Sequence, residues 1–160
     1  EEAIIKRFNG DLANDIGNLV YRTLTMVEKY YEGNVPACPK ASDAASGLIY
    51  AKADRLQTEI SAYLNAGADF NFSAALDTIW ELINMANKHV ENTKPWNLAK
   101  ENRTEELKGF IRLLVDVIRV VADALYPVMP HTAFFIKEQM GEDAIKKGDP
   151  LFPRIDTKKG

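Results

Sequence analysis

The sequence predicts an all-α fold: an antiparallel bundle of about five helices followed by an extended C-terminal tail. In several long stretches, apolar residues recur at i, i+3, i+4 and i+7, which is the spacing of an amphipathic helix. Short segments rich in Pro, Gly or Asn separate these stretches, and no stretch reads convincingly as a strand. Because the connections are short, neighbouring helices are expected to run antiparallel.

The first predicted helix runs from near the start of the chain to Tyr31, and Gly33-Asn34-Val35-Pro36 ends it. Ser42-Asp43 provides an N-cap for a second helix, which continues to about Leu64 and is closed by Asn65-Ala66-Gly67. The core stripe of the first helix consists of Ile5, Phe8, Leu12, Ile16, Leu19, Thr23, Val27 and Tyr30.

The third helix is predicted from about Phe72 to Val90, with Asn71 or Ser73 as its cap. Pro95 must end it, because proline lacks an N–H and excludes the residue before it from the helical region. Lys94-Pro95-Trp96 is therefore expected to be a turn that carries a large flat ring. The apolar stripe of this helix consists of Leu76, Ile79, Trp80, Ile83 and Val90.

The fourth helix is predicted to open at Asn102, because Glu105 follows three residues later and the pair fits a capping-box pattern. Pro127 and Pro130 stop this helix. Its apolar stripe consists of Leu107, Ile111, Leu114, Ile118, Val121 and Leu125.

A short fifth helix is predicted over 131–140, and Gly141 ends it. The segment 150–155 is expected to be extended, with apolar residues that pack down. The helices therefore occupy about 1–141 and the tail 142–160, and together they form one domain.

The composition is that of a soluble globular domain, with 46% hydrophobic and 27% charged residues. Cys38 is the only cysteine, so no disulfide or C-x-x-C metal spacing exists, and a reducing, cytoplasmic setting is expected. No apolar run approaches the roughly 20 residues of a membrane helix. The chain starts without Met and ends without a closing signal, so we expect a piece of a longer protein.

Catalytic motifs are not found in the sequence. There is no Ser-His-Asp set with supporting motifs, no Gly-rich phosphate loop and no H-E-x-x-H. Helical bundles hold di-metal sites with E-x-x-H, but neither His89 nor His131 has a Glu three residues before it. We therefore expect no catalytic residue, no metal site and no cofactor in this chain.

The net charge of −3 argues against a general polyanion binder, because nonspecific nucleic-acid affinity comes from clustered Lys and Arg. Any contact with nucleic acid must be local. The best local candidate is the stretch 88–119, where basic residues slightly outnumber acidic ones. The basic residues are Lys88, Lys94, Lys100, Arg103, Lys108, Arg112 and Arg119.

Asn18 and Arg22 lie one turn apart on the first helix, roughly 100 to 140° away from its core stripe. An Asn amide can pair in two ways with a base edge, and an Arg guanidinium can bind or stack on one. The alternative is an ordinary surface, with Arg22 in an ion pair with Asp15 or another acidic residue and Asn18 solvated. Spacing alone leaves both interpretations open.

Trp96 also has two interpretations. A Trp after Pro at a helix end often packs the turn and is then buried. An exposed Trp beside Lys94 and near polar side chains could instead stack on the unpaired bases of a single-stranded RNA loop.

The segment from Arg7 to Arg22 closely resembles the first helix of the anticodon-binding domain of bacterial methionyl-tRNA synthetases. Four further segments resemble signatures of that family in the same order: 87–89, 93–100, 125–130 and 150–155. The resemblance covers nearly the whole chain. Other class I aminoacyl-tRNA synthetases share the helical bundle, but Asn-x-x-x-Arg combined with Lys-Pro-Trp is typical of the methionine family.

This resemblance implies recognition of the CAU anticodon of methionine tRNA. It implies that Trp96 stacks on the first anticodon base, a cytosine, that Pro95 orients the ring, and that Asn18 and Arg22 hydrogen-bond splayed anticodon bases. Glu91 matches an acidic position credited with repelling wrong anticodons, where many relatives have Asp.

The resemblance also implies a parent enzyme that attaches methionine to tRNA using ATP with magnesium, on a catalytic domain that carries zinc in the family. The motifs of that domain do not occur in this sequence, so we expect the chain to be inactive alone. The implied partners are methionine tRNA, through its anticodon loop, and the enzyme's own catalytic domain, with no membrane and no DNA.

Two alternatives remain at this point. The chain could be a helical scaffold or protein-interaction module without RNA binding, with Trp96 buried in the seam. It could also be the corresponding domain of a synthetase for another amino acid, which would bind a different anticodon loop.

Overall fold

The structure, a computed structural model, describes residue 10 and residues 14–65, 67 and 71–146. These residues form six α-helices and contain no β-strand beyond a single bridge between Asn34 and Ala144, so the predicted all-α fold is confirmed. The helices are α2 (Gly17–Tyr31), α3 (Ala44–Leu64), α4 (Phe72–Thr93), α5 (Pro95–Lys100), α6 (Thr104–Leu125) and α7 (Pro130–Met140).

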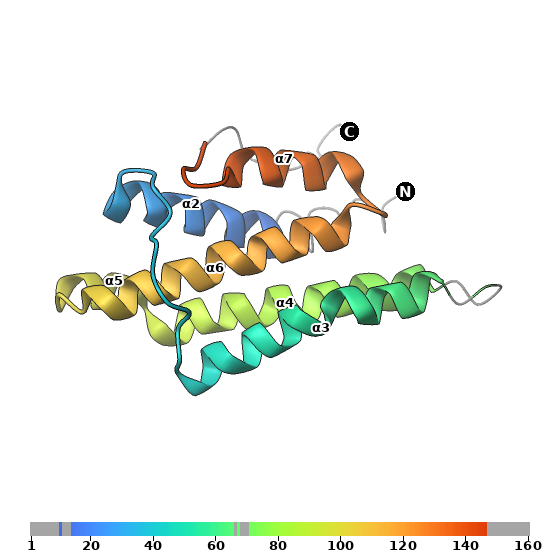
Figure 1. Cartoon of the computed structure of the whole chain (residues 1–160), viewed down its shortest axis with the longest axis horizontal. Coiled ribbons are helices and arrows are strands. Elements are labelled where there is room, and N and C mark those ends of the chain that lie inside the picture. Colours follow the sequence, from blue (N-terminus) through green and yellow to red (C-terminus); the bar gives the residue numbers. More distant parts are fainter. Residues whose placement is uncertain (1–9, 11–13, 66, 68–70, 147–160) are drawn as a thin grey trace, which may run out of the picture.

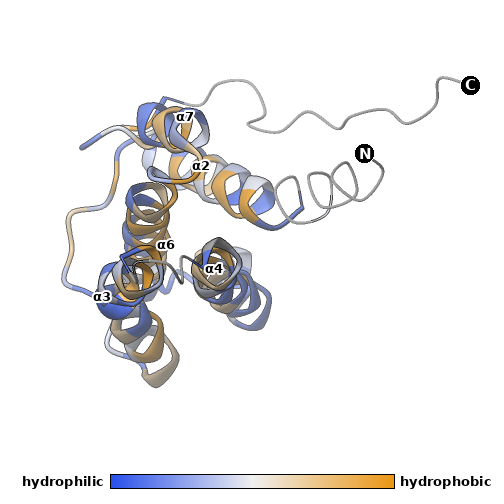
Figure 2. Cartoon of the chain, turned by 90° about the vertical axis from the view of Figure 1, so that its right-hand side faces the viewer, coloured by the Kyte–Doolittle hydropathy of each residue, from blue (hydrophilic) through white to orange (hydrophobic). Residues whose placement is uncertain are grey.

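Helix α6 is the centre of the bundle. It contacts each of the other described helices and lies between α2 and α7 on one side and α3 and α4 on the other (Figure 2). Leu113, Leu114 and Val117 are fully buried because this helix has neighbours nearly all round. Successive long helices run antiparallel, as predicted, whereas α2 and α4 run in the same direction (Figure 1).

Two predicted helix caps are confirmed. The Asp43 carboxylate accepts a hydrogen bond from the Ser46 N–H at 2.9 Å and so opens α3. The Asn71 side chain accepts from the Ala74 N–H at 3.0 Å and opens α4. The predicted end of the second helix at Leu64, with Asn65 as its C-cap, is also found.

The capping box predicted at Asn102 is wrong. Asn102 has φ 56° and ends α5: its N–H donates to the Ala99 carbonyl and the Arg103 N–H donates to the Leu98 carbonyl. This bond pattern is a Schellman motif, which favours Gly or Asn at the left-handed position. Arg103 is the N-cap of α6 and makes no side-chain cap bond. Asn102 is therefore used to end one helix and not to begin the next.

Helix α5 was not among the predicted helices. The predicted stop before Pro95 is confirmed, because α4 ends at Thr93 and Lys94 adopts a left-handed conformation with φ 50°. Pro95 then occupies the first position of α5, where its missing N–H costs no hydrogen bond. The expected turn is thus a sharp corner between two helices.

The segments that follow α2 and α7 lie side by side. The Val35 N–H donates to the Asp143 carbonyl at 2.8 Å, and the Ile145 N–H donates to the Gly33 carbonyl at 2.9 Å. Arg119 of α6 donates to the Gly141 and Glu142 carbonyls and so fixes the end of α7. The predicted core positions Ile5, Phe8 and Leu12 and the tail segment 147–160 lie outside the described residues. Among the described helices, none is long and apolar enough to cross a membrane.

Candidate functional site

Asp15, just before α2, is tied to α4 by two hydrogen bonds. The Trp80 indole N–H donates to its carboxylate at 3.2 Å, and the Asn87 side-chain amide donates to its backbone carbonyl at 3.1 Å. Both donors belong to α4. These bonds fix the position of the first turn of α2 along α4.

Asn18 and Arg22 are both exposed on α2, as their distance from the core stripe predicted. The alternative ion pair between Arg22 and Asp15 is not found in the part of the chain that the structure describes, where the Asp15 carboxylate accepts from Trp80. Among the described residues, neither the Arg22 guanidinium nor the Asn18 amide has a hydrogen-bond or ion-pair partner. Both groups are therefore available to a ligand.

Trp96 lies on α5 directly after the Lys94 corner. Its neighbours Pro95 and Leu98 are buried, whereas 46% of the Trp96 surface is exposed. No described residue accepts a hydrogen bond from its indole N–H. The corner is packed down by Pro95 and Leu98, so the ring is not needed to close it.

Glu91 is exposed on the last turn of α4 and forms no ion pair with any described residue. Helices α2 and α4 run in the same direction (Figure 1). The hydrogen bond between Asp15 and Asn87 therefore gives a common starting point for positions along both helices. Asn18 and Arg22 lie beyond this bond on α2, and Glu91 lies beyond it on α4, before the Trp96 corner. No described contact joins the two α2 residues to Trp96.

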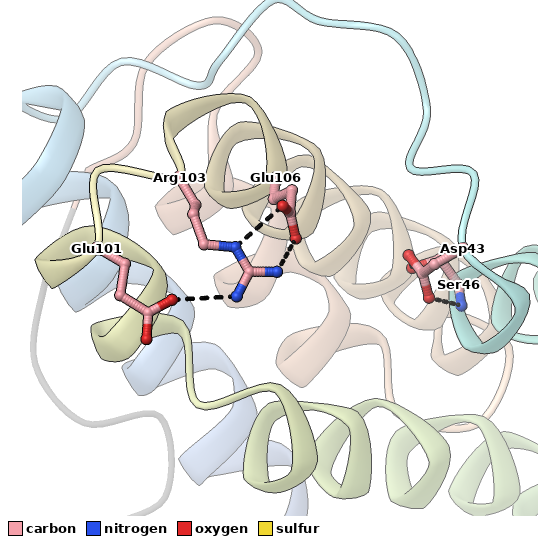
Figure 3. A network of polar contacts seen from close by, with 5 residues as sticks. All are labelled: Asp43, Ser46, Glu101, Arg103 and Glu106. Atoms are coloured by element: carbon pink, nitrogen blue, oxygen red, sulfur yellow. Dashed lines mark hydrogen bonds and ion pairs between the residues drawn. The ribbon is translucent and has the colours of Figure 1, made fainter.

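The basic stretch 88–119 divides into two parts. Its second part is neutralised: Arg103 pairs with Glu101 at 3.1 Å and Glu106 at 2.6 Å (Figure 3), and Lys108 pairs with Glu105 at 3.2 Å. Arg112 and Arg119 also have partners, the Asp116 carboxylate and two backbone carbonyls. In its first part, the exposed lysines have no described ion pair, and these are Lys88, Lys94 and Lys100.

A polar chain that the sequence did not reveal runs beside this corner. The Ser46 hydroxyl donates to the Asp43 carboxylate at 2.6 Å, and its oxygen lies 3.3 Å from Nε2 of His89. Nδ1 of His89 lies 3.3 Å from the Thr93 hydroxyl. Figure 3 shows Asp43 and Ser46 at the start of α3. No spacing signal exists for this chain, because Ser46 and His89 are far apart in the sequence.

The pKa values of Asp43 and His89 in this polar chain follow from their burial and their hydrogen bonds. Burial alone would raise the pKa of the Asp43 carboxyl, but hydrogen bonds from Ser46 hold it below its ordinary value. Burial lowers the pKa of the His89 imidazole, and the nearby Asp43 carboxylate opposes that shift only in part. His89 is therefore neutral at pH 7.

A family model described as the anticodon-binding domain of tRNA ligase matches residues 48–154, which is more than half of the chain. This chain belongs to that family. The anticodon-binding domain extends in this match from α3 to beyond α7, so it includes Glu91, Pro95 and Trp96. Asn18 and Arg22 lie before the matched residues.

Similar full-length proteins are methionine–tRNA ligases. The chain is 37% identical to that of Caldanaerobacter subterraneus over 99% of this chain and 27% of the relative, and 32% identical to that of Bacillus subtilis over 98% and 26%. The chain thus spans about a quarter of the length of the relatives it matches.

Solved structures agree. Apo methionyl-tRNA synthetase of Mycobacterium tuberculosis superposes with a TM-score of 0.88 and 31% identity, over 98% of this chain and 35% of that one. The complex of the same synthetase with methionyl-adenylate gives a TM-score of 0.87 and 31% identity, over 96% and 33%.

Proposed function

We propose that this chain recognises the CAU anticodon of methionine tRNA as the anticodon-binding domain of a methionine–tRNA ligase. Membership of the tRNA-ligase family and similarity to methionine–tRNA ligases support the proposal. The single observation that carries it is Trp96, a large aromatic side chain that is 46% exposed beside a corner already packed by other residues.

In this proposal, Trp96 stacks on the first anticodon base. A flat ring that is exposed and held on a short helix is a suitable platform, because every base presents a π-face. Pro95 restricts the backbone immediately before the ring and so limits the directions in which the ring can point. Lys94 and Lys100, which flank Trp96, supply positive charge for the neighbouring phosphates.

Asn18 and Arg22 supply base discrimination in this proposal. Their side chains lie one turn apart on α2 and are free of described partners, so their donors and acceptors can pair with base edges. Glu91, also exposed, would disfavour wrong anticodons, because an unpaired carboxylate repels phosphate and base acceptors that come too close.

The activity of the whole protein belongs to the same proposal. The full-length ligase would attach methionine to tRNA, and it would use ATP with magnesium on a catalytic domain that would also hold zinc. The M. tuberculosis relative binds methionyl-adenylate, which is the intermediate that such a reaction requires. The catalytic domain and methionine tRNA would be the partners of this chain, in the cytoplasm.

The test is a binding titration of the chain with labelled RNA stem-loops that carry CAU or a single-base change in the anticodon. We expect tightest binding to CAU, and a loss of about 10- to 100-fold in Trp96→Ala, since removing one base–aromatic stack costs roughly 1–3 kcal/mol. Trp80→Phe is the matched control, because it alters the other tryptophan and leaves the corner intact.

Three results would contradict the proposal. Equal affinity for every loop would mean that this chain does not read the anticodon, and tight binding to another loop would favour a synthetase for another amino acid. If Trp96→Ala unfolds the chain and no loop binds, the ring is structural and the scaffold alternative is the better one.

A further inference from the structure

We propose that His89 is a positioning residue that holds the Lys94-Pro95-Trp96 corner in its binding direction by fixing the last turn of α4 to the start of α3. The inference rests on the proposed anticodon recognition by Trp96. It adds a half-buried residue that lies in the signature segment 87–89 but to which neither that resemblance nor the comparisons give a role.

The hydrogen bonds determine which nitrogen of His89 carries the proton. The Ser46 hydroxyl hydrogen is used toward Asp43 at 2.6 Å, so Ser46 can only accept from Nε2 of His89 at 3.3 Å. Nδ1 is then unprotonated and accepts from the Thr93 hydroxyl at 3.3 Å. Each member of the chain donates to the next, from Thr93 through His89 and Ser46 to Asp43.

The imidazole is held in this orientation by its surroundings. It is half-buried and packs against the Phe110 ring of α6 with a centroid separation of 5.1 Å. The charged or titratable groups around it are Asp43 at the α3 cap, Glu105 and Glu106 on α6, and Lys40 and Cys38 of the 38–43 segment. His89 thus connects three elements, α3, α4 and α6.

An open cavity of about 610 Å³ borders the residues on either side of the corner. Thr93, Leu98 and His89 line this cavity together with the 38–43 segment and the start of α6. Side chains do not fill this space, so the α4 side of the corner, at Thr93, is less closely packed than the α5 side, where Pro95 and Leu98 are buried. Leu98 anchors the α5 side of the corner, and the Thr93–His89 bond anchors the α4 side.

The hydrogen bond between Thr93 and His89 matters because of the backbone conformation of Lys94. Lys94 immediately follows Thr93, has φ 50° in the left-handed region, and serves both as the C-cap of α4 and as the N-cap of α5. A residue other than Gly keeps this left-handed backbone conformation only when its surroundings hold it there. If the last turn of α4 loosens, Lys94 can relax, and the direction of the Trp96 ring changes with it.

The test compares His89→Ala with Thr93→Val, which replaces the hydroxyl by a methyl group, and with His89→Asn, whose amide oxygen can accept near the position of Nδ1. All are made in a Trp80→Phe background, so that Trp96 is the only tryptophan. The readouts are the affinity for the CAU stem-loop and the time-resolved fluorescence anisotropy of Trp96 in the free chain.

We expect His89→Ala and Thr93→Val each to weaken CAU binding about fivefold and to make Trp96 more mobile. The double variant should be no worse than His89→Ala alone, because His89→Ala already removes the bond that Thr93→Val removes. His89→Asn keeps an acceptor for Thr93 but has no counterpart of Nε2 for Ser46, so it should regain only part of the affinity that His89→Ala loses. Thr93→Val keeps the fold testable if His89→Ala does not.

The inference is overturned if Thr93→Val and His89→Ala bind CAU normally while Trp96→Ala loses binding, a result that leaves the proposed anticodon recognition intact. It is equally overturned if the losses from His89→Ala and Thr93→Val simply add. If the unaltered chain prefers no anticodon loop, the proposed function fails, and the positioning role fails with it.

Discussion

The two tryptophans of the chain occupy opposite environments. Trp80 lies within α4, is half-buried, and donates its indole N–H to the Asp15 carboxylate at 3.2 Å. Trp96 lies on the short α5, is 46% exposed, and has no described hydrogen-bond partner. One ring joins two helices, and the other projects from a corner that does not need it.

The difference shows how backbone position assigns a role to the same side chain. Trp80 lies at i and i+4 spacing from Leu76, and this stripe turns it toward the bundle, where a buried indole N–H needs an acceptor. Trp96 follows Pro95 and the left-handed Lys94, and the buried positions of its helix are taken by Pro95 and Leu98. Its ring is left for a ligand.

Truncating each ring to Ala is the most direct test of the difference between the two tryptophans. We expect Trp80→Ala to lower the free energy of unfolding by about 3 kcal/mol, the lower end of the range for core Trp truncations, because the ring is only half-buried. Trp96→Ala should lower it by less than about 1 kcal/mol. Urea unfolding monitored by far-UV circular dichroism measures both without depending on either tryptophan.

Trp80→Phe serves as the control for the first effect, because it keeps an aromatic ring but removes the bond to Asp15, which costs about 1 kcal/mol, together with part of the indole. Equal destabilisation by Trp80→Ala and Trp96→Ala would contradict the comparison. It would show that the second ring braces the corner, as the scaffold alternative requires.

Much of the fold was predictable because its signals are local. The caps at Asp43 and Asn71 and the stop before Pro95 depend on residues within one helical turn, and all three were predicted correctly. The exposure of Asn18 and Arg22 likewise follows from helical spacing. These features require no knowledge of what packs against what.

The failures have tertiary or competing causes. Asn102 satisfied a capping pattern, but α5 needed a left-handed residue at the same place, and the Schellman motif prevailed. The pairing of Arg103 with Glu101 and Glu106 could not be read from a charge count. The bond between His89 and Ser46 depends on how α3 packs on α4, which no local pattern encodes.

The lysines extend the comparison from rings to charges. Lys94 and Lys100 flank Trp96 without described ion pairs, whereas Lys108 pairs with Glu105 at 3.2 Å. We expect Lys94→Ala or Lys100→Ala to weaken binding about threefold for every anticodon loop. Each should also lower the slope of log K against log salt by about 0.7, the value for one phosphate on a single strand.

Lys108→Ala is the matched control, because it changes the net charge of the chain equally and should leave the salt slope unchanged. Titrations of the CAU loop at several salt concentrations separate the cases. If all three variants shift the slope alike, overall charge governs binding and the distinction between paired and unpaired lysines is wrong.

The smallest expected effect is the dependence of stability on pH, which tests whether His89 is partly buried in the folded protein. Burial lowers the pKa of His89 below its ordinary 6.5, so in the window just below that pH the unfolded chain binds a proton that the folded chain does not. Stability must therefore fall as the pH falls through that window. The lowered pKa values of Asp43 and Glu59 give the same sign, but their contributions are lost only at more acidic pH, below about 4.

Urea unfolding at pH values between about 7 and 5.5 should show a steady loss of stability for the unaltered chain and a smaller loss for His89→Gln, which has no group that titrates there. Identical pH profiles for the two would mean that the imidazole is as well solvated in the folded protein as in the unfolded one. That result would contradict the burial of His89 within the hydrogen-bonded series from Thr93 to Asp43.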